Sequence, residues 1–220
     1  MRQPAALTKD LASGLVLIRQ ARIPPLAFAL CLMPVMSLGV ALQGLDATTN
    51  LLAQGLMPLW ASILWSAPPM LLGMVVPFLV PLVASLWPSS RPMAPRLWAA
   101  FLLSLALASL IKAATGRVHP EATLPVDLYE RSIRLVLFSG DVFEGWPSGH
   151  AATNGAVALT LASLAQATVT RRMALIWTLW VWAAVVLGIN GQVHWLSDML
   201  AGALLAIAIT FSLHPKARRE

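Results

Sequence analysis

The stretch EGWPSGHAATNG (144–155) places a serine, a glycine and a histidine together at the start of a long apolar run. The proline turn followed by Ser148 predicts a helix N-terminus with Ser148 as its N-cap. Free backbone N–H groups and the helix dipole make such an end suitable for an anion such as phosphate, and Gly149 lets the anion approach the backbone closely. His150 would then be placed for proton transfer. An ordinary helix cap is the alternative interpretation of Ser148 and Gly149 taken alone.

A second candidate group is the segment HWLSD (194–198). His194 and Asp198 are four residues apart and therefore share one face of a helix. A carboxylate in this position can accept a hydrogen bond from one imidazole nitrogen, which fixes the tautomer and leaves the other nitrogen free as a nucleophile or base. The alternative is a buried His–Asp pair that only joins two helices.

The composition indicates that a membrane must position these residues. The chain has 220 residues, of which 58% are hydrophobic and 11% charged, whereas a soluble domain carries about a quarter of charged residues. Long uncharged runs indicate an integral membrane protein. The net charge of +6 is explained by basic residues that flank apolar segments, so no nucleic-acid partner is expected. The single cysteine, Cys31, excludes an internal disulfide and forms no cysteine metal-ligand pattern.

A spanning helix needs about 20 apolar residues, and the sequence predicts an all-α polytopic protein made of one membrane domain, 1–220. Six transmembrane helices are predicted, at 25–45, 69–87, 97–115, 148–166, 173–190 and 194–213. The uncharged stretch 51–87 is too long for one crossing, and APP at 67–69 is expected to break it. We therefore expect 51–66 to form a re-entrant or interfacial helix. The short apolar run 11–18 is expected to lie as an amphipathic segment at the cytoplasmic face.

The charges orient this arrangement in the membrane. With the N-terminus inside, eleven Lys and Arg residues lie on the cytoplasmic side and four on the outer side, as the positive-inside rule requires. The segment 1–24 and the tail 214–220 are then cytoplasmic. The loop 116–147, with an amphipathic helix predicted around 126–138, faces outward. We expect a multi-pass protein of the bacterial inner membrane, with its site facing the periplasm.

Three helix ends carry the ionisable residues to the same side. Lys112 ends the third predicted span, His150 begins the fourth, and His194 and Asp198 begin the sixth. Because all three ends lie at the outer side of the bilayer, the four side chains can converge. Clustered ionisable residues at membrane helix ends are candidates for a functional site.

Together, KAATGRVHP (112–120), PSGH (147–150) and HWLSD (194–198) resemble the three signature motifs of the type 2 phosphatidic acid phosphatase superfamily. The family pattern is Lys-x6-Arg-Pro, Pro-Ser-Gly-His and Ser-Arg-x5-His-x3-Asp. The order of the motifs, the spacing within each of them and the six-span layout agree over about residues 97–213. The resemblance therefore implies a membrane phosphatase fold.

The resemblance also implies roles for individual residues. His194 would attack phosphorus and form a phosphohistidine, Asp198 would orient His194, and His150 would protonate the leaving group and then activate water. The phosphoryl oxygens would be held by Lys112, Ser148 and the Gly149 N–H, because preorganised donors stabilise the charge that develops on these oxygens. This scheme needs no metal ion and no cofactor.

Two positions depart from the family pattern. His119 stands where the first motif has arginine, and Leu187-Gly188 stand where the third has Ser-Arg. Losing a donor to a transition-state oxyanion costs about 3–4 kcal/mol. Arg117, Arg131 or Arg134 could supply a replacement cation, and His119 itself could act as a weaker one. The sequence leaves this choice open.

The function that the resemblance implies is a metal-independent lipid phosphatase. The candidate substrates are undecaprenyl pyrophosphate, phosphatidylglycerophosphate, phosphatidic acid and lipid A phosphates, so the expected partners are membrane lipids. A lipid phosphotransferase is one alternative, because a phosphohistidine can pass its phosphoryl group to an alcohol. A catalytically impaired lipid-phosphate binding protein is the other, because two arginines are missing. The oligomeric state stays open.

Overall fold

The computed structural model describes residues 3–117, 119–120, 135–137 and 145–214. Most of the loop 116–147 therefore lies outside the described residues, including Arg131, Arg134 and most of the helix predicted around 126–138. The described end of that predicted helix, Leu135–Leu137, is a strand instead. It pairs antiparallel with the strand Thr115–Arg117 that directly follows a long helix, so the start and the end of the loop are tied together.

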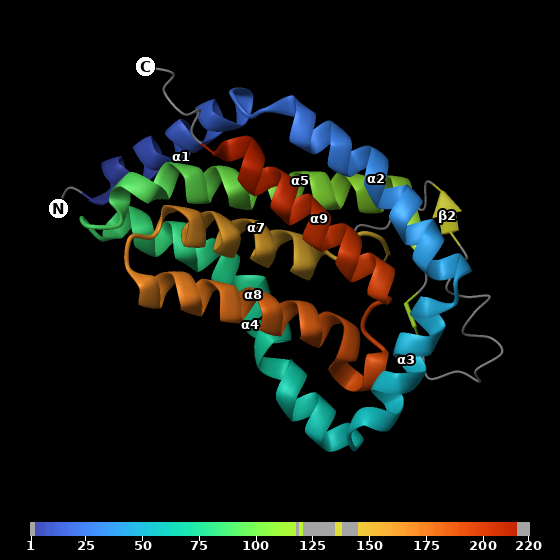
Figure 1. Cartoon of the computed structure of the whole chain (residues 1–220). Coiled ribbons are helices and arrows are strands. Elements are labelled where there is room, and N and C mark those ends of the chain that lie inside the picture. Colours follow the sequence, from blue (N-terminus) through green and yellow to red (C-terminus); the bar gives the residue numbers. More distant parts are fainter. Residues whose placement is uncertain (1–2, 118, 121–134, 138–144, 215–220) are drawn as a thin grey trace.

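The fold is all-α, as predicted, apart from this short strand pair (Figure 1). In chain order the described elements are α1 (Gln3–Arg19), α2 (Ile23–Leu42), α3 (Leu45–Leu56), α4 (Leu59–Leu86), η1 (Arg91–Met93), α5 (Ala94–Ala114), β1 (Thr115–Arg117), β2 (Leu135–Leu137), α7 (Gly149–Leu164), α8 (Thr168–Leu187), η2 (Gly188–Gly191) and α9 (Leu196–Leu213).

Five described helices are long and apolar enough to cross a membrane: Ile23–Leu42, Leu59–Leu86, Arg91–Ala114, Thr168–Gly191 and Leu196–Leu213. The predicted span at 148–166 corresponds to α7, which has only 16 residues. At about 1.5 Å per residue, α7 is shorter than the hydrocarbon core of a bilayer. Helices α4, α5, α8 and α9 surround α7, so protein covers it on several sides. The predicted count of six spans therefore stays a prediction.

The predicted break at 67–69 is wrong. Helix α4 runs through Pro68 and Pro69, and the break falls earlier, at Met57 and Pro58, which both have extended backbone angles. The predicted helix 51–66 is accordingly divided between the end of α3 and the start of α4. Interior prolines bend a membrane helix without ending it, because neighbouring helices and side chains satisfy the freed backbone groups. Figure 1 shows α4 bending along its length.

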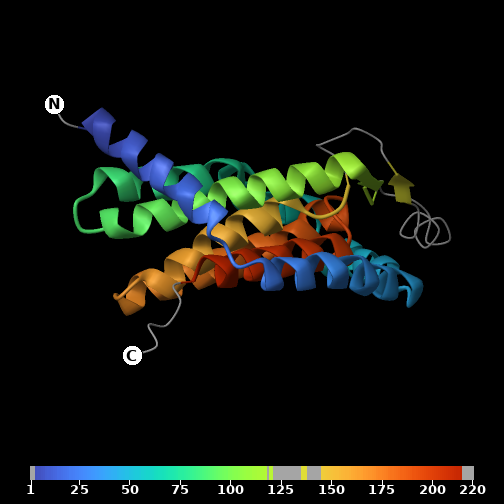
Figure 2. The ribbon, with the colours of Figure 1, turned by 90° about the horizontal axis from the view of Figure 1, so that it is seen from above.

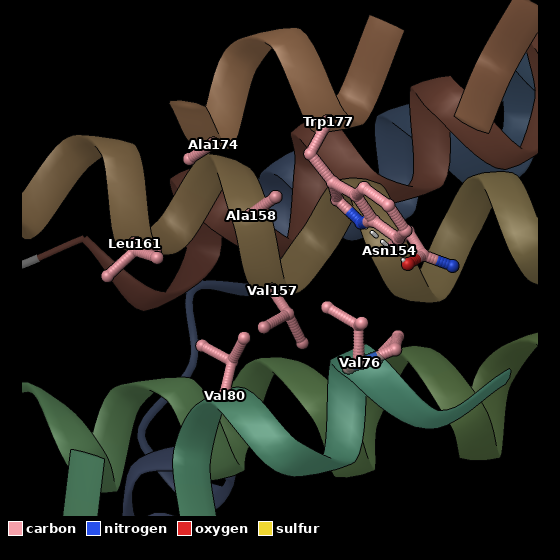
Figure 3. A pocket seen from close by; sticks show the side chains of 9 residues that line it. Val76, Val80, Asn154, Val157, Ala158, Leu161, Ala174 and Trp177 are labelled. Atoms are coloured by element: carbon pink, nitrogen blue, oxygen red, sulfur yellow. Dashed lines mark hydrogen bonds between the residues drawn. The ribbon is translucent and has the colours of Figure 1, made fainter. Parts of the chain in front are cut away.

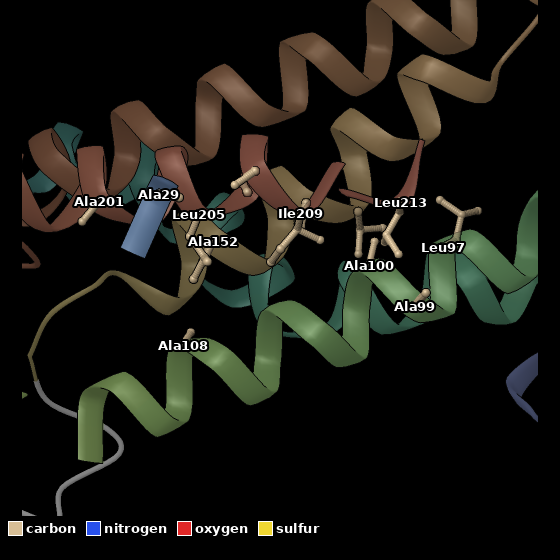
Figure 4. Close-up of a cluster of buried hydrophobic side chains, with 14 of the residues drawn as sticks. Ala29, Leu97, Ala99, Ala100, Ala108, Ala152, Ala201, Leu205, Ile209 and Leu213 are labelled. Atoms are coloured by element: carbon tan, nitrogen blue, oxygen red, sulfur yellow. The ribbon is translucent and has the colours of Figure 1, made fainter. Parts of the chain in front are cut away.

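The core of the bundle is built from small residues. Helix α7 buries mainly small residues, above all alanine, and packs against α9. A Cβ atom on Gly155 would lie 2.7 Å from the Ala206 Cβ, and one on Gly202 would lie 2.6 Å from the Ser148 carbonyl oxygen. Small residues let helix backbones approach this closely without gaps. Figure 4 shows alanine and leucine side chains from α5, α7 and α9 meeting in this core.

The two ends of the bundle differ in what they hold. The start of α1 and the end of α9 lie near one end, whereas α3, η2 and the strand pair lie at the other (Figures 1 and 2). The predicted amphipathic segment 11–18 belongs to α1, which packs along α5. Leu17 and Ile18 of α1 contact the buried core, so α1 is part of the bundle. The end that carries α3 is the one where the three motifs meet.

Candidate functional site

The second and third motifs are joined through their backbones. The Ser148 N–H donates to the Asp198 carbonyl oxygen at 3.0 Å. The Ser148 hydroxyl accepts from the Ala151 N–H at 3.3 Å, which confirms Ser148 as the N-cap of α7. Ser148 is completely buried. The first turn of α7 is therefore fixed against the first turn of α9.

Lys112 reaches the same place from the last turn of α5. It is buried, and its Cε lies 3.7 Å from the point where a Cβ on Gly149 would be. The lysine side chain therefore runs beside the N-terminus of α7, where free N–H groups and a cation together favour an anion. The structure thus brings Lys112, Ser148 and Gly149 together.

His194 and Asp198 are paired as the sequence spacing predicts. The His194 Nδ1 lies 3.4 Å from the Asp198 Oδ2, and both side chains are buried. His194 lies in the turn between two spans, where burial lowers its pKa to about 4, although the hydrogen bond and charge of Asp198 act in the opposite direction. The imidazole is therefore neutral near pH 7. With its Nδ1–H directed at Asp198, the Nε2 lone pair is available for attack.

His150 is held against α4. Its Nε2 lies 3.1 Å from the Met70 carbonyl oxygen, and its Cδ2 lies 3.1 Å from the place that a Cβ on Gly73 would take. When Nε2–H donates to Met70, Nδ1 is the ring nitrogen left to exchange a proton. The proton-transfer role of His150 stays a prediction.

His119 lies beside His194. The two ring centroids are 4.8 Å apart, with the planes tilted by 58°. The His119 Nδ1 is 2.5 Å from the Val193 carbonyl oxygen, so the peptide before His194 orients the His119 ring. The position where the family pattern has arginine is thus next to the candidate nucleophile.

Arg117 has a different environment. Its NH1 donates to the Asp198 Oδ1 at 2.5 Å and to the Ser197 hydroxyl at 2.6 Å, and its NH2 donates to Asp46 at 2.6 Å. The guanidinium carbon also lies 5.5 Å from the centroid of the Trp195 ring. Both terminal nitrogens of Arg117 therefore already bind protein acceptors. The direct phosphate contact predicted for Arg117 stays a prediction.

Asp46 is a residue that the sequence analysis missed. It is 1% exposed, and besides Arg117 it accepts from the Ser197 N–H at 2.8 Å and the Ser197 hydroxyl at 2.6 Å. Asp46 lies in no motif and is 151 positions from Ser197, so local spacing could not find it. The available signal was its charge, because an acidic residue between two apolar membrane segments is a candidate functional residue.

The second departure from the family pattern has a steric explanation. A Cβ on Gly188 would lie 2.7 Å from the Ser66 Cβ of α4, so no side chain fits at position 188. The η2 turn that contains Gly188 is held by α4, since the Asn190 N–H donates to the Ser62 hydroxyl at 2.9 Å. It is also held by α3, because Asn50 donates to the Gly191 carbonyl oxygen at 2.7 Å.

The comparisons with known proteins agree with this fold. A family model described as the PAP2 superfamily matches residues 94–219. The structure is similar to the crystal structure of a transmembrane PAP2 type phosphatidylglycerolphosphate phosphatase from Bacillus subtilis, with a TM-score of 0.54 and 15% sequence identity over 87% of this chain and 94% of that chain. A search of curated proteins found no match. Because the family match covers more than half of its residues, the chain belongs to the PAP2 superfamily.

Proposed function

We propose that this protein is a lipid phosphatase that hydrolyses a lipid phosphate or pyrophosphate through a phosphohistidine on His194. The observation that carries the proposal is the His194–Asp198 pair, buried and joined through the Asp198 carbonyl to Ser148 at the α7 N-terminus. A nucleophile with its orienting carboxylate thus lies at the helix end suited to binding phosphate. Family membership supports the same reaction class.

The proposed reaction has two steps. His194 Nε2 attacks phosphorus, the bond to the leaving oxygen breaks, and that oxygen takes a proton from His150. Water then attacks the phosphohistidine while His150 takes a proton from the water, and the P–N bond breaks to release phosphate. The negative charge of Asp198 stabilises the positive charge that develops on the phosphorylated imidazole, and the buried setting strengthens this interaction.

In this proposal the phosphoryl oxygens bind to Lys112, Ser148, the Gly149 N–H and His119. Lys112 and Gly149 lie beside each other at the start of α7, and His119 lies against the ring of His194. Arg117 differs from this group because its terminal nitrogens already bind carboxylates. The proposed site requires no metal ion or cofactor.

An apolar cavity supports a lipid substrate. A cavity of about 140 Å³ lies between α4, α7 and α8, and Val76, Val80, Val157 and Leu161 are among the residues that line it (Figure 3). Asn154, one helical turn after His150 on α7, is also among the lining residues. A short part of a hydrocarbon tail in this cavity would leave the lipid phosphate near the start of α7. Undecaprenyl pyrophosphate, phosphatidylglycerophosphate, phosphatidic acid and lipid A phosphates remain the candidates.

The test is phosphate release by the detergent-purified protein on a panel of these lipids, with and without EDTA. We expect release that survives EDTA and falls by about 10³-fold or more in His194→Ala, because the nucleophile is lost. His214→Ala is the matched control, since His214 is exposed at the far end of α9. A phosphoryl group on His194, found by mass spectrometry under mild alkaline conditions, would identify the intermediate.

The same experiment separates the alternatives. Activity that persists in His194→Ala would contradict the mechanism. Transfer of phosphate to an added alcohol, with little release to water, would establish a phosphotransferase. Binding of a lipid phosphate by a folded protein without turnover would favour the binding protein.

A further inference from the structure

A buried polar cluster lies behind His194, formed by Asp46, Arg117, Ser197 and Asp198. The side chains of Asp46, Arg117 and Asp198 are 0%, 3% and 2% exposed, and Ser197 is completely buried. The cluster joins α3, β1 and the first turn of α9. No step of the proposed reaction uses Asp46, Ser197 or Arg117.

Asp46 holds the first turn of α9 from α3. Its Oδ1 accepts from the Ser197 N–H at 2.8 Å, and its Oδ2 accepts from the Ser197 hydroxyl and from Arg117, each at 2.6 Å. The Ser197 N–H is one of the first-turn donors that have no acceptor within their own helix. A carboxylate at a helix N-terminus is also favoured by the helix dipole. Asp46 therefore fixes the turn that carries Asp198.

Arg117 lies between two carboxylates, at 2.6 Å from Asp46 and 2.5 Å from Asp198. One carboxylate would neutralise the guanidinium, so the three groups together carry a formal charge of −1. Buried ion pairs contribute little net stability compared with apolar packing, whereas removing one partner is costly. The buried charges are therefore better explained by the geometry that they impose on Asp198 than by a gain in folding stability.

The two oxygens of Asp198 have separate partners. Oδ1 accepts from Arg117, and Oδ2 lies 3.4 Å from the His194 Nδ1 and accepts from the Trp195 N–H at 3.2 Å. Binding of Oδ1 by Arg117 fixes the rotation of the carboxylate. That rotation is what presents Oδ2 to His194.

We propose that Asp46 and Arg117 are positioning residues for His194: Asp46 holds Arg117, and Arg117 holds the Asp198 carboxylate in the rotation that directs Oδ2 at His194. This inference rests on the proposed function, since it concerns the same phosphohistidine chemistry. The second carboxylate also leaves net negative charge beside His194, where positive charge develops when phosphorus bonds to Nε2.

The test compares kcat and KM of Asp46→Asn and Asp46→Glu on the preferred lipid. We expect Asp46→Asn to lower kcat by about 10-fold to 100-fold, by analogy with the cost of removing a group that orients a metal ligand. KM should change by less than about threefold, because the Asp46 side chain is fully buried and binds Arg117 and Ser197. Asp46→Glu should recover part of kcat. The matched control is Asp10→Asn, which removes a buried carboxylate paired with Arg91 at 3.4 Å in α1 and should leave kcat unchanged.

A double-mutant cycle tests whether the two residues act through each other. Arg117→Gln alone should also lower kcat, and the loss in Asp46→Asn with Arg117→Gln should be clearly smaller than the product of the two single losses, because Asp46 acts in part through Arg117. Additive losses would overturn the proposal. A raised KM with unchanged kcat in Arg117→Gln would also overturn it, because that result assigns Arg117 to substrate binding.

A reaction without lipid separates this inference from the proposed function. Phosphoramidate is a small donor that phosphorylates imidazole, so the labelling rate of His194 can be followed by mass spectrometry. Slower labelling in Asp46→Asn than in wild type and Asp10→Asn supports positioning even if no lipid is hydrolysed. Equal labelling in folded wild type and Asp46→Asn overturns it. If thermal unfolding shows Asp46→Asn to be unfolded, Ser197→Ala replaces it, because it keeps the N–H to Asp46 and removes one donor.

Discussion

At the scale of single residues, the site has a neutral nucleophile, His194, and few cationic side chains that could bind phosphate. Burial holds the pKa of His194 at about 4 against the effect of Asp198, so its lone pair is available at neutral pH. Arg117 is paired with two carboxylates. Lys112 and the His119 imidazole are the other basic groups that the described part of the chain brings close to His194. Phosphate binding at this site should therefore depend on position 119.

His119→Arg should raise kcat/KM, because a guanidinium stays charged and can bind two phosphate oxygens at once. We expect kcat/KM to rise by about 10-fold. This is less than the roughly 10²-fold to 10³-fold loss in rate that removing one such donor causes, because the new side chain recovers only part of the effect. The measurement is steady-state phosphate release, with His214→Arg as the control for added charge away from the site. A loss of activity in folded His119→Arg would show that a compact imidazole is required here.

At the scale of elements, glycine and serine contacts position the motifs. Gly202 allows α9 to approach Ser148 at the start of α7, and the Ser148 N–H then reaches Asp198. Helices α3 and α4 hold the η2 turn through Asn50 and Ser62. The relative placement of α7 and α9 therefore decides whether the phosphate end and the nucleophile face the same space.

Gly202→Ala should destabilise the protein and lower its activity. The new Cβ would lie 2.6 Å from the Ser148 carbonyl oxygen and 2.9 Å from the Ala151 Cβ, and overpacking of this kind costs about 1–3 kcal/mol. Gly39→Ala in α2 is the matched control, because nothing beyond its own turn of helix lies within 4 Å of its Cβ position. Thermal unfolding in detergent and phosphate release together check the pair. Equal melting temperatures for both variants would show that α7 and α9 can separate at no cost.

At the scale of the whole molecule, the site lies at the end of the bundle that holds α3, away from the start of α1 (Figures 1 and 2). The turn between α4 and α5 lies at the opposite end, beside the start of α1 (Figure 1). If the N-terminus is cytoplasmic, as the basic residues predict, the site faces the periplasm. Substrates would then be lipid phosphates of the outer leaflet of the inner membrane.

Cysteine labelling tests this orientation in a Cys31→Ser background, because the native cysteine is exposed. A membrane-impermeant maleimide should label Gly55→Cys, at the exposed end of α3, in intact spheroplasts. It should label Ser89→Cys, exposed in the α4–α5 turn, only after lysis. The opposite pattern would place the site in the cytoplasm and contradict the predicted topology.

Much of the fold and part of the site follow from local sequence. The apolar runs predict the membrane helices, Ser148 predicts the start of α7, and the spacing of His194 and Asp198 predicts their pairing. These features depend on hydrophobicity, capping and helix periodicity, which act within a few residues of the chain. They can therefore be recognised without knowing what packs against them.

Other features depended on contacts between distant segments. Asp46 binds Ser197 across 151 positions, and Ser66 closes position 188 to any side chain. Helix α4 continues through Pro68 and Pro69, as a membrane helix can where surrounding groups take over the hydrogen bonds that proline removes. Residues that are distant in the sequence determine which groups bind a buried charge, how much space lies beside a glycine and whether a helix ends at a proline. Only the tertiary structure shows which residues these are.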